Sequence, residues 1–83
     1  MSDLIIPNTR INRVNNLNKK IGLKIRLARV ANEMSQKDLA TKMQVCQRAI
    51  SSYETGTNGV DAIALFKVAK ILNQNVSFFD PFN

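Results

Sequence analysis

Four polar residues with helical spacing are the side chains of this chain best suited to bind a macromolecule. Gln47 and Arg48 are followed one helical turn later by Ser51 and Ser52, and the residues between them are apolar. An amide, a guanidinium and two small hydroxyls can hydrogen-bond to DNA base edges and phosphates without filling a groove. The sequence therefore predicts a helix over about residues 46–54 whose exposed face could contact nucleic acid.

Two short amphipathic helices, joined by a tight polar break at residues 44–46, are predicted to position this face. Ser35 followed by Asp38 has the form of a capping box, which begins a first helix of about eight residues. A helix pair joined by so short a turn is how a helix-turn-helix DNA reader is built. The apolar faces of the two helices are Leu39, Ala40 and Met43 in the first, and Val45, Ala49, Ile50 and Tyr53 in the second.

The rest of the chain predicts further helical segments and no strand. Residues 1–20 are rich in asparagine, which favours helix poorly, and we expect them to form a basic arm or a weak extra helix. A firmer apolar pattern predicts a helix that begins at Ile21, and Asp61 is a suitable N-cap for a later one. A short final turn capped by Ser77 follows. The expected fold class is all-α, a compact bundle of about five short helices, with an N-terminal extension before a single domain over residues 21–83.

The helix that begins at Ile21 carries more apolar surface than one core face requires. Leu23, Leu27 and Val30 form a second stripe at i, i+4 and i+7. One interpretation is a helix that is simply buried on a broad face. Another is contact with a second chain. A third is packing against the apolar residues of the N-terminal extension, which are Ile5, Ile6, Ile11 and Val14.

Composition favours a polyanionic partner over other classes of ligand. Twelve Lys and Arg against six Asp and Glu give a net charge of +6, and half of that excess lies in residues 1–20. Such a basic domain is expected to attract polyanions such as nucleic acid or an acidic membrane surface. The lack of histidine, of a close carboxylate pair and of a phosphate-binding glycine loop argues against an enzyme, a metal site, a cofactor or a small-molecule ligand. A single cysteine and the lack of a long apolar run favour a cytoplasmic protein without a membrane anchor.

At many positions at once the chain resembles a known family. From Gly22 to about Phe79, roughly 70% of the chain, it is similar to the phage repressor and Cro-like (xenobiotic-response-element type) helix-turn-helix family. The resemblance implies a lambda-repressor-like fold that binds double-stranded DNA. The matching residues are Ile25-Arg26, Arg29, Ser35-Gln36, Leu39-Ala40, Ile50-Ser51, Tyr53-Glu54, Gly56, Leu65, Val68-Ala69 and Leu72.

The resemblance also implies roles for individual residues. The helix over about residues 46–54 corresponds to the recognition helix, which enters the major groove. Gln36 resembles a glutamine that braces a DNA phosphate and contacts this helix. Gln47 and Arg48 fall in the first exposed turn, where the family contacts base edges. The other DNA-binding candidates are Cys46 at the start of the helix, Ser51 and Ser52 one turn on, and Thr55, Thr57 and Asn58 in the loop that meets the DNA backbone.

Structural features are implied by the same resemblance. Arg29 and Glu54 resemble a pair that ties the first helix of the domain to the end of the recognition helix. Where the family often has glycine, this chain has Glu33 and Gln44, and a positive φ there would cost about 1 kcal/mol each. Cys46 occupies an N-cap that usually holds Ser or Thr, and a thiol at a helix N-terminus can be reactive, so redox sensitivity is one hypothesis.

Together these features predict a transcriptional regulator, expected to be a repressor that binds a palindromic operator as a homodimer. Two alternatives stay open, an antitoxin-type DNA-binding protein that also neutralises a protein partner, and a protein-interaction module that does not bind DNA. The basic residues of the arm could follow phosphates or enter a minor groove; they are Arg10, Arg13, Lys19 and Lys20. The expected dimer surface is the apolar tail of Val76, Phe78, Phe79 and Phe82, or else Leu23, Leu27 and the N-terminal isoleucines.

Overall fold

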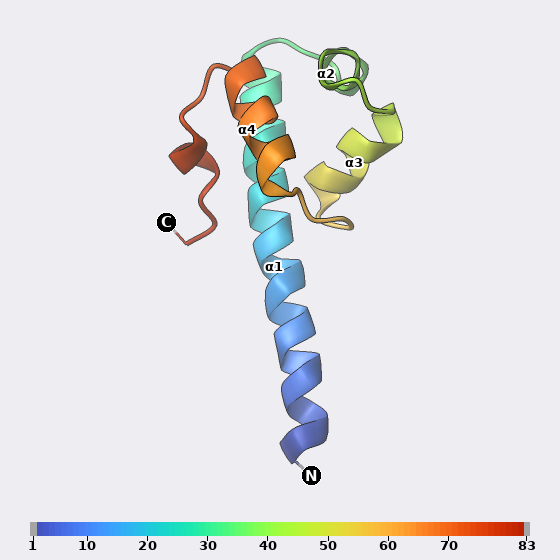
Figure 1. Cartoon of the computed structure of the whole chain (residues 1–83), viewed down its shortest axis with the longest axis vertical. Helices are drawn as coiled ribbons and strands as arrows, with labels where there is room; N and C mark the ends of the chain where they lie inside the picture. Colours follow the sequence, from blue (N-terminus) through green and yellow to red (C-terminus); the bar gives the residue numbers. More distant parts are fainter. Residues whose placement is uncertain (1, 83) are drawn as a thin grey trace.

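The computed structural model describes the backbone of residues 2–82 and the side chains of residues 16–82. Within these residues it has four α-helices, one 3-10 helix and no strand, which confirms the predicted all-α class. One helix is long and three are short, and the expected final turn is the 3-10 helix. In chain order the elements are α1 (Ser2–Ala31), α2 (Gln36–Met43), α3 (Gln47–Thr55), α4 (Ala62–Ile71) and η1 (Val76–Phe79) (Figure 1).

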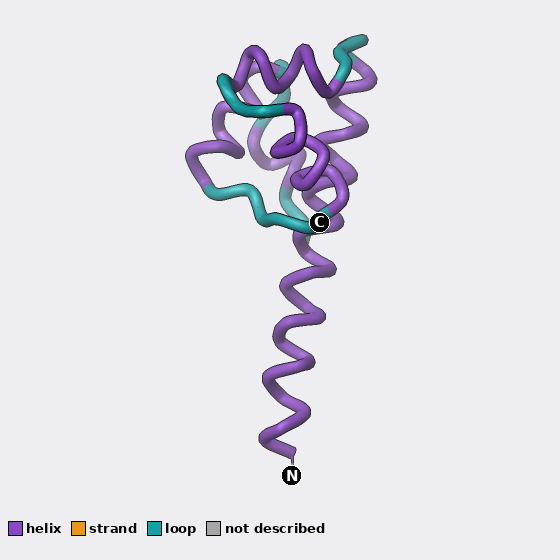
Figure 2. The backbone as a smooth tube through the Cα atoms, turned by 90° about the vertical axis from the view of Figure 1, so that its right-hand side faces the viewer, coloured by secondary structure: helices purple, strands orange, loops and turns teal. Residues whose placement is uncertain are grey.

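The long helix α1 extends well beyond the rest of the bundle. Its 30 residues span about 45 Å at 1.5 Å per residue, close to the 49 Å longest dimension of the molecule. Figures 1 and 2 show the other helices and the C-terminal segment gathered around the C-terminal half of α1 only. The helix passes residue 20 without a break, so the expected arm is the first part of α1. The division of the chain into residues 1–20 and 21–83 stays a prediction.

The stripe of Leu23, Leu27 and Val30 lies at the surface of α1. These side chains are 54%, 55% and 56% exposed, so burial of α1 on a broad face is wrong. The four apolar residues expected to cover the stripe from the N-terminal extension have side chains outside the described residues.

The hydrophobic core draws at least one residue from every helix. Burial of each such side chain contributes about 1.5–3 kcal/mol, so the core holds the short helices in place. Phe79 is fully buried there, which corrects its predicted place on a dimer surface: η1 turns this ring inward and leaves Phe78 partly exposed. The largest fully buried side chains are Ile25 of α1, Leu39 of α2, Ile50 of α3, Val68 of α4, Leu72 at its end and Phe79 of η1.

Side-chain caps begin three of the elements. The predicted capping box is present: Asp38 N–H donates to Ser35 Oγ at 2.9 Å, and Ser35 N–H donates to Asp38 Oδ2 at 3.1 Å. The Ser35 backbone N–H, followed by the Ser35 side chain, lowers the pKa of Asp38 below its ordinary 3.8 by stabilising the carboxylate. Asp61 caps α4 as predicted. The cap of η1 is Asn75, whose Oδ1 accepts from Ser77 N–H at 3.2 Å, so the prediction of Ser77 as the cap was wrong.

Three non-glycine residues adopt the left-handed conformation at helix ends. Glu33, Gln44 and Asn73 have φ of 56°, 60° and 55°. The first two are the positions where the family often has glycine. The backbone therefore keeps the turn geometry that glycine would favour, and the strain is borne by larger residues.

Candidate nucleic-acid interface

Helix α3 presents a polar face to solvent and an apolar face to the core. Gln47 and Arg48 are exposed on its first turn, Ser51 and Ser52 are half-buried, and Ile50 is fully buried. The structure therefore exposes both long polar side chains, as the sequence predicts. Ser51 and Ser52 are less accessible than these two residues.

The N-terminus of α3 lacks a side-chain cap. Cys46 has the extended N-cap backbone, with φ −77° and ψ 155°, but its side chain forms no cap hydrogen bond. The thiol is exposed. N–H groups of the first turn are therefore left for solvent or for a ligand.

A partly buried hydrogen-bond network fixes α3 against α1 and α2. Arg29 Nε donates to Glu54 Oε2 at 2.6 Å, and Arg29 Nη2 donates to Oε1 at 3.1 Å, which confirms the expected pair. Gln36 Nε2 donates to the same Oε1 at 3.0 Å, so Gln36 contacts α3 as the resemblance implies. Arg29 Nη1 also donates to the Met34 carbonyl at 2.7 Å and so holds the turn before α2. One carboxylate thus joins three helices.

Gly22 sets the distance between α1 and α3. A Cβ at this position would collide with the backbone carbonyls of Tyr53 and Glu54. Only glycine allows the last turn of α3 to lie so close to α1. The sequence places Gly22 at the start of the family resemblance but gives no sign of this contact, because it joins residues far apart in the chain.

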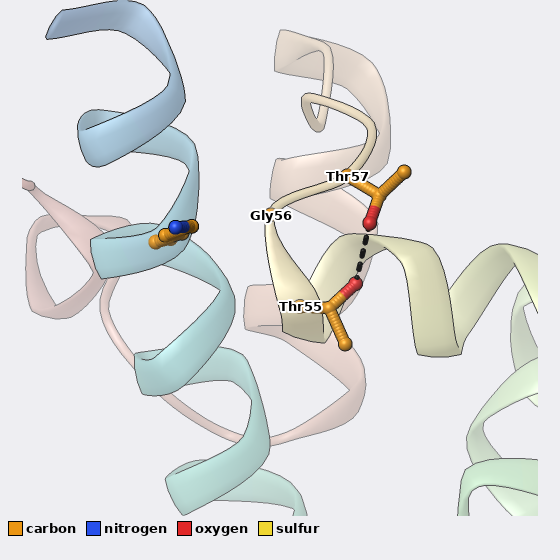
Figure 3. A pocket seen from close by; sticks show the side chains of 4 residues that line it. Thr55, Gly56 and Thr57 are labelled. Atoms are coloured by element: carbon orange, nitrogen blue, oxygen red, sulfur yellow. Dashed lines mark hydrogen bonds between the residues drawn. The ribbon is translucent and has the colours of Figure 1, made fainter. Parts of the chain in front are cut away.

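The loop after α3 lies directly on α1. Gly56 ends the helix with φ 79°, and a Cβ on it would lie 2.7 Å from the Lys19 backbone nitrogen. Thr55 and Thr57, on either side, bring their hydroxyl oxygens to 2.9 Å (Figure 3). Together with Lys19 these residues line an open depression of about 300 Å³. The sequence predicts Thr55 and Thr57 as contact residues but assigns Lys19 to a separate arm.

The predicted contact residues fall into two groups at opposite ends of α3. Gln47 and Arg48, with Cys46 before them, lie at its beginning. Thr55 and Thr57 lie at its end, together with exposed Asn58, whose N–H donates to the Ser52 carbonyl at 3.3 Å. Arg48 and Thr55 are seven residues apart along the helix, which corresponds to about 10 Å. Helix α3 therefore holds the two groups at a fixed separation.

Metal and membrane features were sought in the part of the chain that the structure describes. No three His, Cys, Asp or Glu side chains there gather into a group able to hold a metal ion. No helix in that part has both the length and the apolar character needed to cross a bilayer.

Comparison with known proteins agrees with this geometry. A family model described as helix-turn-helix matches residues 25–79, which include α2, α3 and the turn between them. The chain belongs to the Cro/C1-type helix-turn-helix family. Members of this family bind double-stranded DNA. In family terms, α2 and α3 are the helix-turn-helix and α3 is the recognition helix.

Two relatives of this chain are uncharacterised HTH-type transcriptional regulators from Sinorhizobium medicae and Rhizobium meliloti. Each is 42% identical over 59 residues, which are 71% of this chain and 42% of the relative. The chain therefore spans about two fifths of the length of these relatives. A transcriptional regulator encoded in the ATPase CF(0) region of Rhodospirillum rubrum is 27% identical over 74 residues, 89% of this chain and 68% of that protein.

Solved structures share the fold. The restriction-modification controller protein C.AhdI from Aeromonas hydrophila superposes with a TM-score of 0.71 and 24% identity, over 75% of this chain and 94% of its own. The clp gene regulator ClgR from C. glutamicum superposes with a TM-score of 0.72 and 24% identity, over 76% of this chain and 82% of its own. At this identity the likeness concerns the arrangement of the helices.

Proposed function

We propose that this chain is a sequence-specific DNA-binding transcriptional regulator that inserts α3 into the major groove. The observation that carries the proposal is that Gln47 and Arg48 are both exposed on the first turn of a helix whose other end is held by the Glu54 ion pair. The net charge of +6 supplies the general attraction to a polyanion.

Base recognition falls to the first turn of α3. Arg48 can donate two hydrogen bonds to the O6 and N7 of guanine, and Gln47 can form the equivalent bidentate pair with adenine. Each such pair contributes about 1–3 kcal/mol of discrimination against a wrong base. Ser51 and Ser52 are short and half-buried, so we assign them water-mediated contacts.

The remaining candidates position the protein on the DNA backbone. Gln36 uses one amide N–H for Glu54, and its second N–H stays available for a phosphate. At the beginning of α3, where the Cys46 side chain forms no cap hydrogen bond, N–H groups of the first turn stay available for a phosphate. Thr55, Thr57 and Asn58 lie at the other end. Contacts of this kind fix register and orientation and carry no sequence information directly.

We further propose that two copies bind a palindromic operator and act as a repressor. Half-sites read by such dimers lie about 34 Å apart, one turn of DNA. With Phe79 in the core, the C-terminal segment still exposes Phe82 by 80%, Phe78 by 37% and Val76 by 36%, and we assign the dimer contact to these three. Phe82→Asp should then dissociate the dimer in sedimentation equilibrium, whereas Leu27→Asp should not; the reverse result would assign the contact to α1.

Selection of bound duplexes from a random pool, at a stated salt concentration, tests the function. The expected result is a consensus with two inverted half-sites whose centres lie one helical turn apart. Recovery of sequences without any shared motif would show that the chain does not discriminate between bases. A single, non-repeated motif would retain the recognition by α3 and overturn the dimer.

A further inference from the structure

We propose that Lys19, Thr55 and Thr57 form a binding site for one phosphodiester of the DNA backbone, so that α1 takes part in holding the duplex. The inference rests on the proposed function. It adds a residue of α1 to the contact surface and assigns a specific anion to the depression at the end of α3.

The donors around this depression are suited to a single anionic group. The Lys19 ammonium carries three N–H donors, and within the described residues no carboxylate lies at ion-pair distance from it. Thr55 Oγ1 makes a long hydrogen bond to the Ser52 carbonyl, at 3.3 Å, and a short one to Thr57 Oγ1, at 2.9 Å. If Thr55 gives up the weaker bond and donates to Thr57, the Thr57 hydroxyl proton is free for a phosphate oxygen. Lys19 and Thr57 can then donate to the same anion.

The position of the depression matches the position of a DNA strand. The major groove is about 12 Å wide, and the nine residues of α3 span about 13 Å. When the first turn contacts base edges, the far end of the helix therefore reaches the wall of the groove, where the phosphates lie. Thr55, Gly56 and Thr57 occupy that end (Figure 3).

The site is held rigid by the contact between Gly56 and α1. Because the Gly56 Cα approaches the Lys19 backbone so closely that a Cβ would overlap it, loop and helix cannot shift independently. The conformation with φ 79° at Gly56 further defines the loop. Little backbone ordering is then required on binding, which favours affinity.

Lys20 provides a matched control for Lys19. The two lysines are adjacent, exposed and identically charged, but they point about 100° apart around α1 and only Lys19 lines the depression. Lys19→Gln and Lys20→Gln remove the same charge from the same helix turn. Thr57→Val removes a hydrogen bond from the site without changing its charge. Circular dichroism of each variant verifies the fold.

The test is the salt dependence of binding to two duplexes, one selected from the random pool and one with the same bases scrambled. Lys19→Gln should weaken both by the same factor and reduce the slope of log K against log salt by about 0.9, the release of one counterion. When salt rises from 50 to 200 mM, the loss of affinity should therefore be about 3.5-fold smaller for Lys19→Gln than for the unaltered chain. Thr57→Val should weaken binding with an unchanged slope, and Lys20→Gln should alter the slope less than Lys19→Gln.

An unchanged slope for Lys19→Gln, or equal slopes for the two lysine variants, would overturn the site while leaving the proposed function intact. Failure of the unaltered chain to bind either duplex at 50 mM salt would overturn both. A titration with inorganic phosphate alone should give no saturation at millimolar concentration; saturation there, without an effect of Lys19→Gln on DNA binding, would assign the site to a free anion.

Discussion

Arg29 and Glu54 form a bidentate ion pair that is almost inaccessible to solvent, with side chains 11% and 4% exposed and the Nε to Oε2 distance at 2.6 Å. The pair joins α1 to the last turn of the recognition helix, and Gln36 of α2 adds a hydrogen bond to the same carboxylate. The orientation of α3 relative to the other two helices therefore depends on one side chain.

Glu54→Ala should lower the free energy of unfolding by about 3–5 kcal/mol, because it leaves the Arg29 guanidinium buried without a counter-charge. Urea unfolding followed by circular dichroism measures the change. The double variant Arg29→Met, Glu54→Leu should recover most of the loss, since it removes both charges. A loss below 1 kcal/mol for the single variant would show that the pair is a surface contact in solution.

Gln44→Gly should stabilise the domain by about 1 kcal/mol, because the residue at the C-cap of α2 has φ 60° and glycine adopts this conformation without a Cβ penalty. The melting temperature should rise by about 4–8 °C for a domain of this size. Gln44→Ala is the control, which keeps the Cβ and should give no such gain. Equal effects of the two substitutions would contradict the left-handed turn.

The carboxylate half of the capping box, in which Asp38 accepts from the Ser35 N–H, should stabilise the fold most while Asp38 is ionised. Since folding lowers the pKa of Asp38 below 3.8, its contribution is fully present above that pH and is lost as the pH falls through the lower, folded-state pKa. The difference in unfolding free energy between the unaltered chain and Asp38→Asn should be present at pH 6 and shrink at pH 2. A difference independent of pH would mean that the charge has no part in the cap.

Cys46→Ser should raise the free energy of unfolding by about 0.5–1 kcal/mol, because a serine hydroxyl can accept the N–H bond that the thiol does not make. Ser35→Ala, which removes an existing cap of α2, should cost a similar amount. The measurement is urea unfolding under reducing conditions. A stability equal to that of the unaltered chain would indicate that the start of α3 gains nothing from a side-chain cap.

Local features of this fold were predictable, whereas contacts between distant residues were not. Ser35 and Asp38 are three residues apart, so the sequence alone indicates their capping box. Arg29 and Glu54 were predicted only through the family resemblance. Nothing in the sequence indicates that Gly56 lies on the backbone of Lys19.

The structure at the two ends of the chain was likewise not predictable from the sequence alone. Propensity argues against a continuous helix through the asparagine-rich segment, yet α1 runs through it without a break. In the C-terminal segment, the apolar residues alternate too irregularly to show which ring enters the core, and it is Phe79 that does so. Asn75 and Ser77 are both suitable caps, so sequence could not choose between them.

The central claim is that Arg48 contacts a defined base, and the most direct test is the affinity of Arg48→Ala for the selected duplex and for its single-base variants. We expect the unaltered chain to lose about 1–3 kcal/mol of binding at one symmetric pair of positions when guanine is replaced. Arg48→Ala should bind the original and replaced duplexes equally, while Lys37→Ala, a change of charge outside α3, should keep the preference. Full retention of the preference at every position by Arg48→Ala would contradict the claim that Arg48 contacts a base.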